Sequence, residues 1–316
     1  MYDCVIIIVK AAAYWRNHLY GDASLTKLPP MRGLIASVIA YIVLWLATPK
    51  VSFLPGPVLL VLTTIVFMAV QIAIVYFFSS LKMKWWQNLA CTLVCIGITV
   101  SILLIIASQI GSKTRVANYY GLLRIPLSLT IMFAAAGIGC AVAERVKDRN
   151  LLLPVVMFAA YIDFWTVTRG PVAAILQRAP HVAQIASVPI PQAGTGKFTP
   201  ISLIGPGDFL FMALVFAAVN RLGMNGRRNY WFVFGAMTVG MLAVVLGIVS
   251  FLPALIMLAV AAITANWGQF KLTRQEAIST IAVGILLIGS LPIIWQVLAP
   301  KEKKQRPAVS KPIRKQ

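Results

Sequence analysis

The sequence predicts an all-α integral membrane protein, a polytopic helical bundle with about nine transmembrane helices. Of its 316 residues, 60% are hydrophobic and only 11% are charged, and the mean hydropathy is +0.86. A soluble domain carries roughly 25% charged residues. The apolar residues are gathered in stretches that approach the roughly 17 to 25 residues needed to cross a bilayer as a helix. This composition excludes a soluble globular domain.

Short polar segments and segments rich in glycine or proline divide the apolar residues into stretches of near-spanning length. We interpret each stretch as one helix, and the first and the eighth are among the shortest. In chain order the predicted spans are Gly33 to Thr48, Val58 to Phe78, Leu89 to Ala107, Ile125 to Ala143, Leu151 to Val167, Ile201 to Val219, Tyr230 to Val249, Phe251 to Asn266 and Ile278 to Ala299.

The N-terminal segment, 1–32, is predicted to lie at the membrane surface. Its apolar run from Cys4 to Val9 is interrupted by Lys10, so it fits neither a secretory signal nor a membrane span. Arranged as a helix, this segment has one polar and one apolar face, which is typical of an interfacial helix. The N-terminal transmembrane helices then occupy 33–147, and the remaining ones occupy 148–299.

The net charge of +20 would suggest a nucleic-acid partner in a soluble protein. Here the Lys and Arg residues lie in the short loops and in the basic C-terminal tail, 300–316, so membrane orientation explains them better and no nucleic-acid partner is expected. The tail could bind anionic membrane lipid, and a solvated end fits it equally well. The charges balance across the two sides, so they do not fix the orientation.

Asp163 in the fifth stretch and Asp208 in the sixth are the only acidic residues inside the predicted spans. A carboxylate in hydrocarbon costs several kcal/mol, so such a residue is a candidate functional group. Consecutive spans run antiparallel, and an acid late in one therefore lies near the same membrane face as an acid early in the next. The other acidic residues lie at span ends, in loops or in tails: Asp3, Asp22, Glu144, Asp148, Glu276 and Glu302.

Two carboxylates a few ångströms apart cannot both ionise cheaply, so one keeps its proton while the other acts as a base. That pair suits peptide hydrolysis, in which the base activates a water and the acid protonates the carbonyl oxygen and later the leaving amine. The four cysteines and two histidines show neither a disulfide framework nor a metal-ligand pattern. We therefore expect no metal and no organic cofactor.

The residues before Asp208 prepare the backbone for a close approach. Gly205 and Gly207 remove side chains beside the carboxylate, so backbone or a substrate strand can come near it. Pro206 lacks an N–H and disfavours helix before it, so the helix that carries Asp208 is predicted to start at this point. Irregular backbone at membrane depth is tolerated where it lines a wet cavity, and hydrolysis requires water.

Three motifs occur in a specific order: Asp163, Phe164 and Trp165; Gly205, Pro206, Gly207 and Asp208 followed by Phe209 and Phe211; and Pro253, Ala254 and Leu255. Together they resemble the presenilin and signal peptide peptidase family of intramembrane aspartyl proteases, in a form expected of a prokaryote. The resemblance covers roughly Leu151 to Asn266. It implies a presenilin-like fold and the catalytic pair Asp163 and Asp208. It further implies active-site shaping by Gly205, Pro206, Gly207, Tyr161 and Phe209, and substrate binding beside Pro253, Ala254 and Leu255.

The chain departs from the family pattern in three places. The family has a tyrosine directly before its first aspartate, whereas Ile162 stands there in this chain and Tyr161 lies one residue further back. Four predicted spans rather than five precede Asp163, and one more follows the helix of Pro253. Some family members need partner subunits and others do not, and the sequence does not distinguish these two cases.

The connection 168–200 between the two acids is rich in proline, which argues against one continuous helix. Val182 to Val188 is predicted to form a short helix and Lys197 to Ile204 to be extended. We expect Phe198 to Ile204 to pair with an unwound substrate as a β-strand, with Ile201 and Leu203 as substrate-binding residues.

Other functions fit parts of this pattern. Two intramembrane carboxylates also suit a proton- or cation-coupled transporter, although no inverted repeat is evident. A prepilin peptidase also uses a Gly-x-Gly-Asp aspartate, but it usually has a lysine soon afterwards, where Phe209 stands here. An inactive scaffold would bear the cost of two buried acids without any chemistry in return.

The favoured prediction is an aspartic endopeptidase that cuts transmembrane segments or signal peptides within the bilayer. Its substrates and the membrane lipid are the expected partners, and the plasma membrane of a prokaryote is the expected location. A helical peptide bond is shielded by its own hydrogen bonds and side chains, so the substrate is expected to unwind before it is cut.

Overall fold

The computed structural model describes residues 29–51, 55–109, 116–168, 184–194, 200–249 and 252–297. Most of these residues are helical, and each predicted apolar stretch overlaps a helix. The helices are α2 (Pro30–Ala47), α3 (Gly56–Ser79), α4 (Trp85–Gln109), α5 (Val116–Ala143), α6 (Arg149–Thr168), α9 (Pro206–Arg221), α10 (Gly226–Val245), α11 (Ala254–Ala265) and α12 (Arg274–Val297), with a short 3-10 turn (Thr48–Lys50) after α2.

Six helices of the described chain, α2, α3, α4, α5, α6 and α10, are long and apolar enough to cross a membrane. The protein is therefore an all-α, multi-pass membrane protein. The helix α11 is apolar but has only 12 residues. Nine complete crossings and a presenilin-like fold remain predictions.

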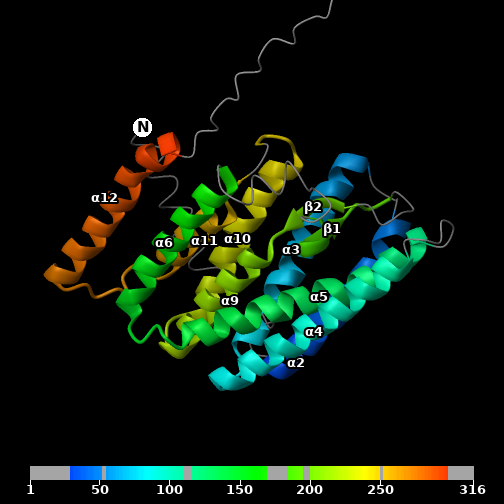
Figure 1. Ribbon diagram of the computed structural model, residues 1–316, viewed down its shortest axis with the longest axis horizontal. Helices are drawn as coiled ribbons and strands as arrows, with labels where there is room; N and C mark the ends of the chain where they lie inside the picture. Colours follow the sequence, from blue (N-terminus) through cyan, green and yellow to red (C-terminus); the bar gives the residue numbers. More distant parts are fainter. Residues whose placement is uncertain are drawn as a thin grey trace, which may run out of the picture.

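The helices form a bundle around α9 (Figure 1). The long helix α5 packs against α4 on one side and against α9 on the other, and α3 packs against α2, α9 and α10. At the opposite edge α6 packs against α11, and α12 packs against the outer side of α6. Large apolar side chains on α4, including Leu93, Val94 and Leu104, are exposed, as expected for a surface that faces lipid.

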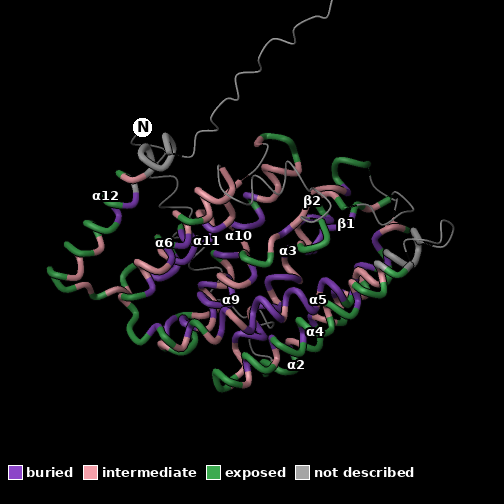
Figure 2. Tube along the Cα trace, viewed as in Figure 1, coloured by how far each residue is buried: buried purple, intermediate pink, exposed green. Residues whose placement is uncertain are grey.

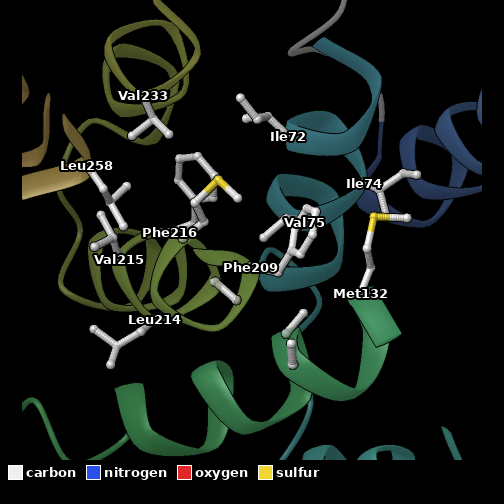
Figure 3. Packing of buried hydrophobic residues seen from close by; sticks show 14 of the residues in the cluster. Ile72, Ile74, Val75, Met132, Phe209, Leu214, Val215, Phe216, Val233 and Leu258 are labelled. Atoms are coloured by element: carbon white, nitrogen blue, oxygen red, sulfur yellow. The ribbon is translucent and has the colours of Figure 1, made fainter. Parts of the chain in front are cut away.

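The buried residues concentrate where α3, α5 and α9 meet (Figure 2). Phe209 and Phe216 of α9 are fully buried, and they lie near Ile72 and Val75 of α3 (Figure 3). On the other side, Gly139 of α5 touches the backbone of α9 so closely that an added Cβ would collide with the Leu210 carbonyl. The central helix is therefore held on several sides by tight packing.

A β-hairpin precedes α9. Strand β1 (Val188–Pro191) pairs antiparallel with β2 (Pro200–Ile204), with Val188 opposite Ile204 and Ile190 opposite Ser202. The predicted extended conformation is confirmed for the described residues of β2. The predicted sixth span began at Ile201 and was wrong there, because β2 ends at Ile204 and α9 begins at Pro206, as the proline favours.

Two other boundaries differ from the predictions. The fourth span was predicted to begin after Arg124, but α5 begins at Val116 and so contains this arginine. The predicted short helix is seen at residues 184–186 and ends before its expected limit, since Val188 belongs to β1. The interfacial segment as far as residue 28, the connection at 169–183 and 195–199, and the basic tail 300–316 lie outside the described residues.

Candidate active site

Asp163 lies in the last two turns of α6, and its carboxylate faces the start of α11. Its Oδ2 accepts a hydrogen bond of 3.0 Å from the backbone N–H of Leu255. That N–H belongs to the first turn of α11, where backbone donors have no partner within the helix. The carboxylate therefore satisfies a donor that would otherwise be left over. The structure brings the first predicted acid and the Pro-Ala-Leu motif into direct contact.

Asp208 is the third residue of α9, and its carboxylate turns back to cap the helix. Its Oδ2 accepts a hydrogen bond of 3.2 Å from the N–H of Gly205, while its own N–H donates to the Gly205 carbonyl at 3.2 Å. Pro206 occupies the first helical position, where its missing N–H costs nothing. A negative charge in the first turn is also favoured by the helix dipole. These local contacts fix the Asp208 carboxylate at the N-terminal end of α9.

The two carboxylates are close enough to interact electrostatically. The helices α6 and α9 pack against each other and both pack against α11, so the three motifs meet at one place in the bundle. Both aspartates are half-buried, whereas Pro206 and Gly207 are exposed. The Gly207 Cα faces open space, because an added Cβ would meet no atom within 4 Å. The turn beside Asp208 therefore lies at the surface of the described structure.

The remaining predicted site residues divide into two groups. Pro253 caps α11 and, like Ala254, is half-buried, and the edge residues Ile201 and Leu203 of β2 are half-buried as well. The other group supports the helices. The Tyr161 hydroxyl hydrogen-bonds the Ser290 hydroxyl of α12 at 2.6 Å, and Phe209 is buried against α3.

The sequence analysis did not identify two residues that support the elements around the candidate site. Ser290 lies in an apolar stretch, where a single serine does not indicate a specific partner. Arg124 was counted with a loop, although a cation inside an apolar helix is itself a signal for a specific partner. Its guanidinium donates to the carbonyls of Gln184 and Ser187, just before β1.

Among the described residues, no group of three or more histidines, cysteines, aspartates or glutamates is gathered as metal ligands would be. Comparison with known proteins identified no relative: no family model, no curated protein and no solved structure matches this chain.

Proposed function

We propose that this protein is an intramembrane aspartyl endopeptidase with Asp163 and Asp208 as its catalytic pair. The observation that carries the proposal is the meeting of three separate motifs. The Asp163 carboxylate accepts a hydrogen bond from the Leu255 N–H. Asp208 is close enough to Asp163 for their charges to interact, and it follows the exposed residue Gly207. Two acids shielded within a membrane bundle are costly, and peptide hydrolysis is a chemistry that uses both.

The proposed reaction divides one proton between the two carboxylates, because two close negative charges disfavour each other. The ionised carboxylate takes a proton from water, and the resulting hydroxide adds to the carbonyl carbon of the substrate. The protonated carboxyl group gives its proton to the carbonyl oxygen. The tetrahedral intermediate then collapses and its C–N bond breaks. The first carboxyl group passes the proton taken from water to the leaving amine, and a hydroxyl of the intermediate returns a proton to the second carboxylate as the carboxylic acid product forms. Every proton is returned, so the pair is ready for another cycle.

The open edge of β2 supports the proposal that the substrate binds as an extended strand. Pro189 stands opposite Leu203 and has no N–H, so this pair cannot exchange both ladder hydrogen bonds. By the alternation of antiparallel pairs, Ser202 and Ile204 bond to β1, while the backbone groups of Leu203 face the other edge. No further described strand pairs with β2. A strand bound at this edge would run toward Gly205 and Asp208.

The proposed substrates are transmembrane segments or signal peptides, which reach the site through the bilayer. The apolar exterior, with exposed side chains such as Leu93 and Leu104, is suited to lipid contact. We place the protein in the plasma membrane of a prokaryote. No cofactor is part of the proposed mechanism.

The test is cleavage of a synthetic transmembrane peptide by the purified protein in liposomes, followed by mass spectrometry of the products. Cuts within the apolar stretch are expected for the natural chain, and Asp163→Asn and Asp208→Asn should each abolish them while the fold is retained. Full activity of either variant would refute the shared pair. A lack of cleavage, together with pH-dependent ion flux that needs both aspartates, would instead favour a proton- or cation-coupled transporter.

Substrate pairing is tested by removing one outward N–H of β2. Leu203→Pro should abolish cleavage without unfolding the protein, because proline fits an edge strand but cannot donate to a bound strand. Leu203→Ala is the matched control, since it shortens the same side chain and keeps the N–H. Equal cleavage by the two variants would exclude pairing through Leu203, and Ile201→Pro repeats the test at the neighbouring position.

A further inference from the structure

The hairpin before Asp208 is attached to the N-terminal helices on both sides of β1. Before the strand, the Arg124 guanidinium of α5 donates hydrogen bonds to the carbonyls of Gln184 and Ser187, the latter at 3.4 Å. After the strand, the N–H of Gly194 donates to the carbonyl of Thr48, at the end of α2, at 3.3 Å. Strand β1 is thus fixed at both ends by helices that are distant in sequence from the catalytic pair.

These two attachment points are connected to each other. The indole N–H of Trp45, one turn before Thr48, donates to the carbonyl of Gly121, one turn before Arg124, at 3.0 Å. Trp45 also packs edge-on against Phe67 of α3. The ends of α2 and α5 near the hairpin are therefore joined by a direct hydrogen bond.

An arginine on an apolar helix is expensive unless its guanidinium is satisfied. Arg124 is half-buried, and the two carbonyls it reaches lie 60 and 63 positions along the chain. A charged donor strengthens such bonds relative to neutral ones. These contacts offset the cost of the cation when the segment before β1 is in place, so Arg124 favours that position of the segment.

The position of β1 determines the position of β2 and hence of the turn that leads to Asp208. Val188 and Ile190 are completely buried, and Val188 stands opposite Ile204, which is followed by Gly205. A slip of one residue would move a strand by about 3.3 Å and turn its side chains to the wrong face. The contacts of the hairpin with the N-terminal helices therefore determine the position of the turn that leads to Asp208.

We propose that Arg124 is a positioning residue that sets which peptide bond of the substrate is presented to the catalytic pair. This inference rests on the proposed function, because the open edge of β2 is taken as the surface where substrate pairs. Arg124 acts through the hairpin and not on the substrate itself. If Arg124 has this role, replacing it should spread the cuts over more peptide bonds of the substrate.

The experiment compares Arg124→Gln with Arg221→Gln in the full-length protein in liposomes. Arg221 is a matched control, because it also donates to a backbone carbonyl between helices, that of Ala143, but at the far end of α5. Mass spectrometry of the products from one transmembrane peptide gives the share cut at each bond. We expect Arg124→Gln to raise the share of cuts at neighbouring bonds about tenfold, since small misplacements have large effects on reaction geometry. Arg221→Gln should keep the natural pattern.

Hydrogen exchange measured on the same variants makes the outcome independent of proteolysis. The amides of Ile190 and Ser202 should exchange about tenfold faster in Arg124→Gln, because the hairpin has lost one of its supports. An unchanged distribution of cuts, even at a lower rate, would overturn the positioning role, and so would unchanged exchange. If the natural chain cleaves nothing, the proposed protease function fails, while the exchange measurement still decides whether Arg124 holds the hairpin.

Discussion

The two helices that carry the carboxylates are placed very differently in the bundle. The helix α9, with Asp208, lies at the centre and is surrounded by α3, α5, α10 and α11, whereas α6, with Asp163, lies near the rim between α11 and α12. In α6 only Leu152, Val156 and Ala159 are buried. In α9 the buried residues are Phe209, Met212, Ala213, Leu214, Val215, Phe216, Ala218 and Val219.

Because of this difference, substitutions near the two aspartates should have different effects, on stability near Asp208 and on activity near Asp163. The position of Asp208 follows from the packing of the whole core, so changes around it affect folding. The position of Asp163 depends on the packing of α6 against α11 and α12, together with the Leu255 N–H and the bond between Tyr161 and Ser290. A functional pair must be held to within about 0.5 Å. Changes around α6 should therefore reduce activity before they reduce stability.

The largest effect is expected where α5 meets α9. Gly139→Ala places a methyl group against the Leu210 carbonyl and 3.0 Å from the Ala213 Cβ, and the backbone cannot move away easily. We expect a loss of stability of about 3 kcal/mol. Thermal unfolding in detergent measures it.

Gly97→Ala is the control for that substitution. Gly97 is also inside an apolar helix, α4, but an added Cβ there meets nothing within 4 Å. The control should be neutral or more stable by up to about 1 kcal/mol, since alanine favours helix. Equal stability of the two variants would mean that α9 is not closely packed, and the contrast between the two helices would fail.

An intermediate effect, a difference in activity between two variants, is expected at the contact between α11 and Asp163, where both variants also lose the packing of the buried Leu255. Leu255→Pro removes the N–H that Asp163 accepts, and proline is tolerated in the first turn of a helix. Leu255→Ala keeps the N–H and removes the same packing. Since hydrogen bonds to charged groups contribute about 1.5 to 3 kcal/mol, hydrolysis by the proline variant should be about tenfold slower than by the alanine variant, or slower still. Initial cleavage rates at saturating peptide give the comparison, and equal rates would show that the bond does not position Asp163.

Composition and spacing predicted the helices and the two acids because these depend on local properties of the chain. The apolar stretches overlap the helices, and α9 begins at Pro206 as the chemistry of proline favours. The contact between Asp163 and Leu255 could not be predicted in detail, since every residue except proline has an N–H and the partners are 92 positions apart. Arg124 was misplaced because its carbonyl partners are also distant.

The orientation of Tyr161 was predictable from helix geometry. Two positions along an α-helix correspond to a rotation of roughly 200°, so Tyr161 and Asp163 project from nearly opposite sides of α6. Asp163 faces α11, and Tyr161 accordingly reaches α12. The family resemblance favoured a tyrosine at the site, but the tyrosine of this chain stands one residue too early for that face. For the direction in which Tyr161 projects, the helical period is therefore a better guide than the family motif.

The smallest effect is expected from breaking the bond between α6 and α12. Tyr161→Phe and Ser290→Ala each remove one hydroxyl of the 2.6 Å pair, and the phenyl ring keeps the packing of the tyrosine. Each variant should lose about 1 kcal/mol of stability, and the double variant should lose little more, because both substitutions break the same bond. Cleavage rates should fall equally and modestly in all three, since α12 affects Asp163 only through the position of α6. If Tyr161→Phe abolished hydrolysis while Ser290→Ala did not, the tyrosine hydroxyl would act at the carboxylates directly, and the rim helix α6 would be able to turn Tyr161 toward them.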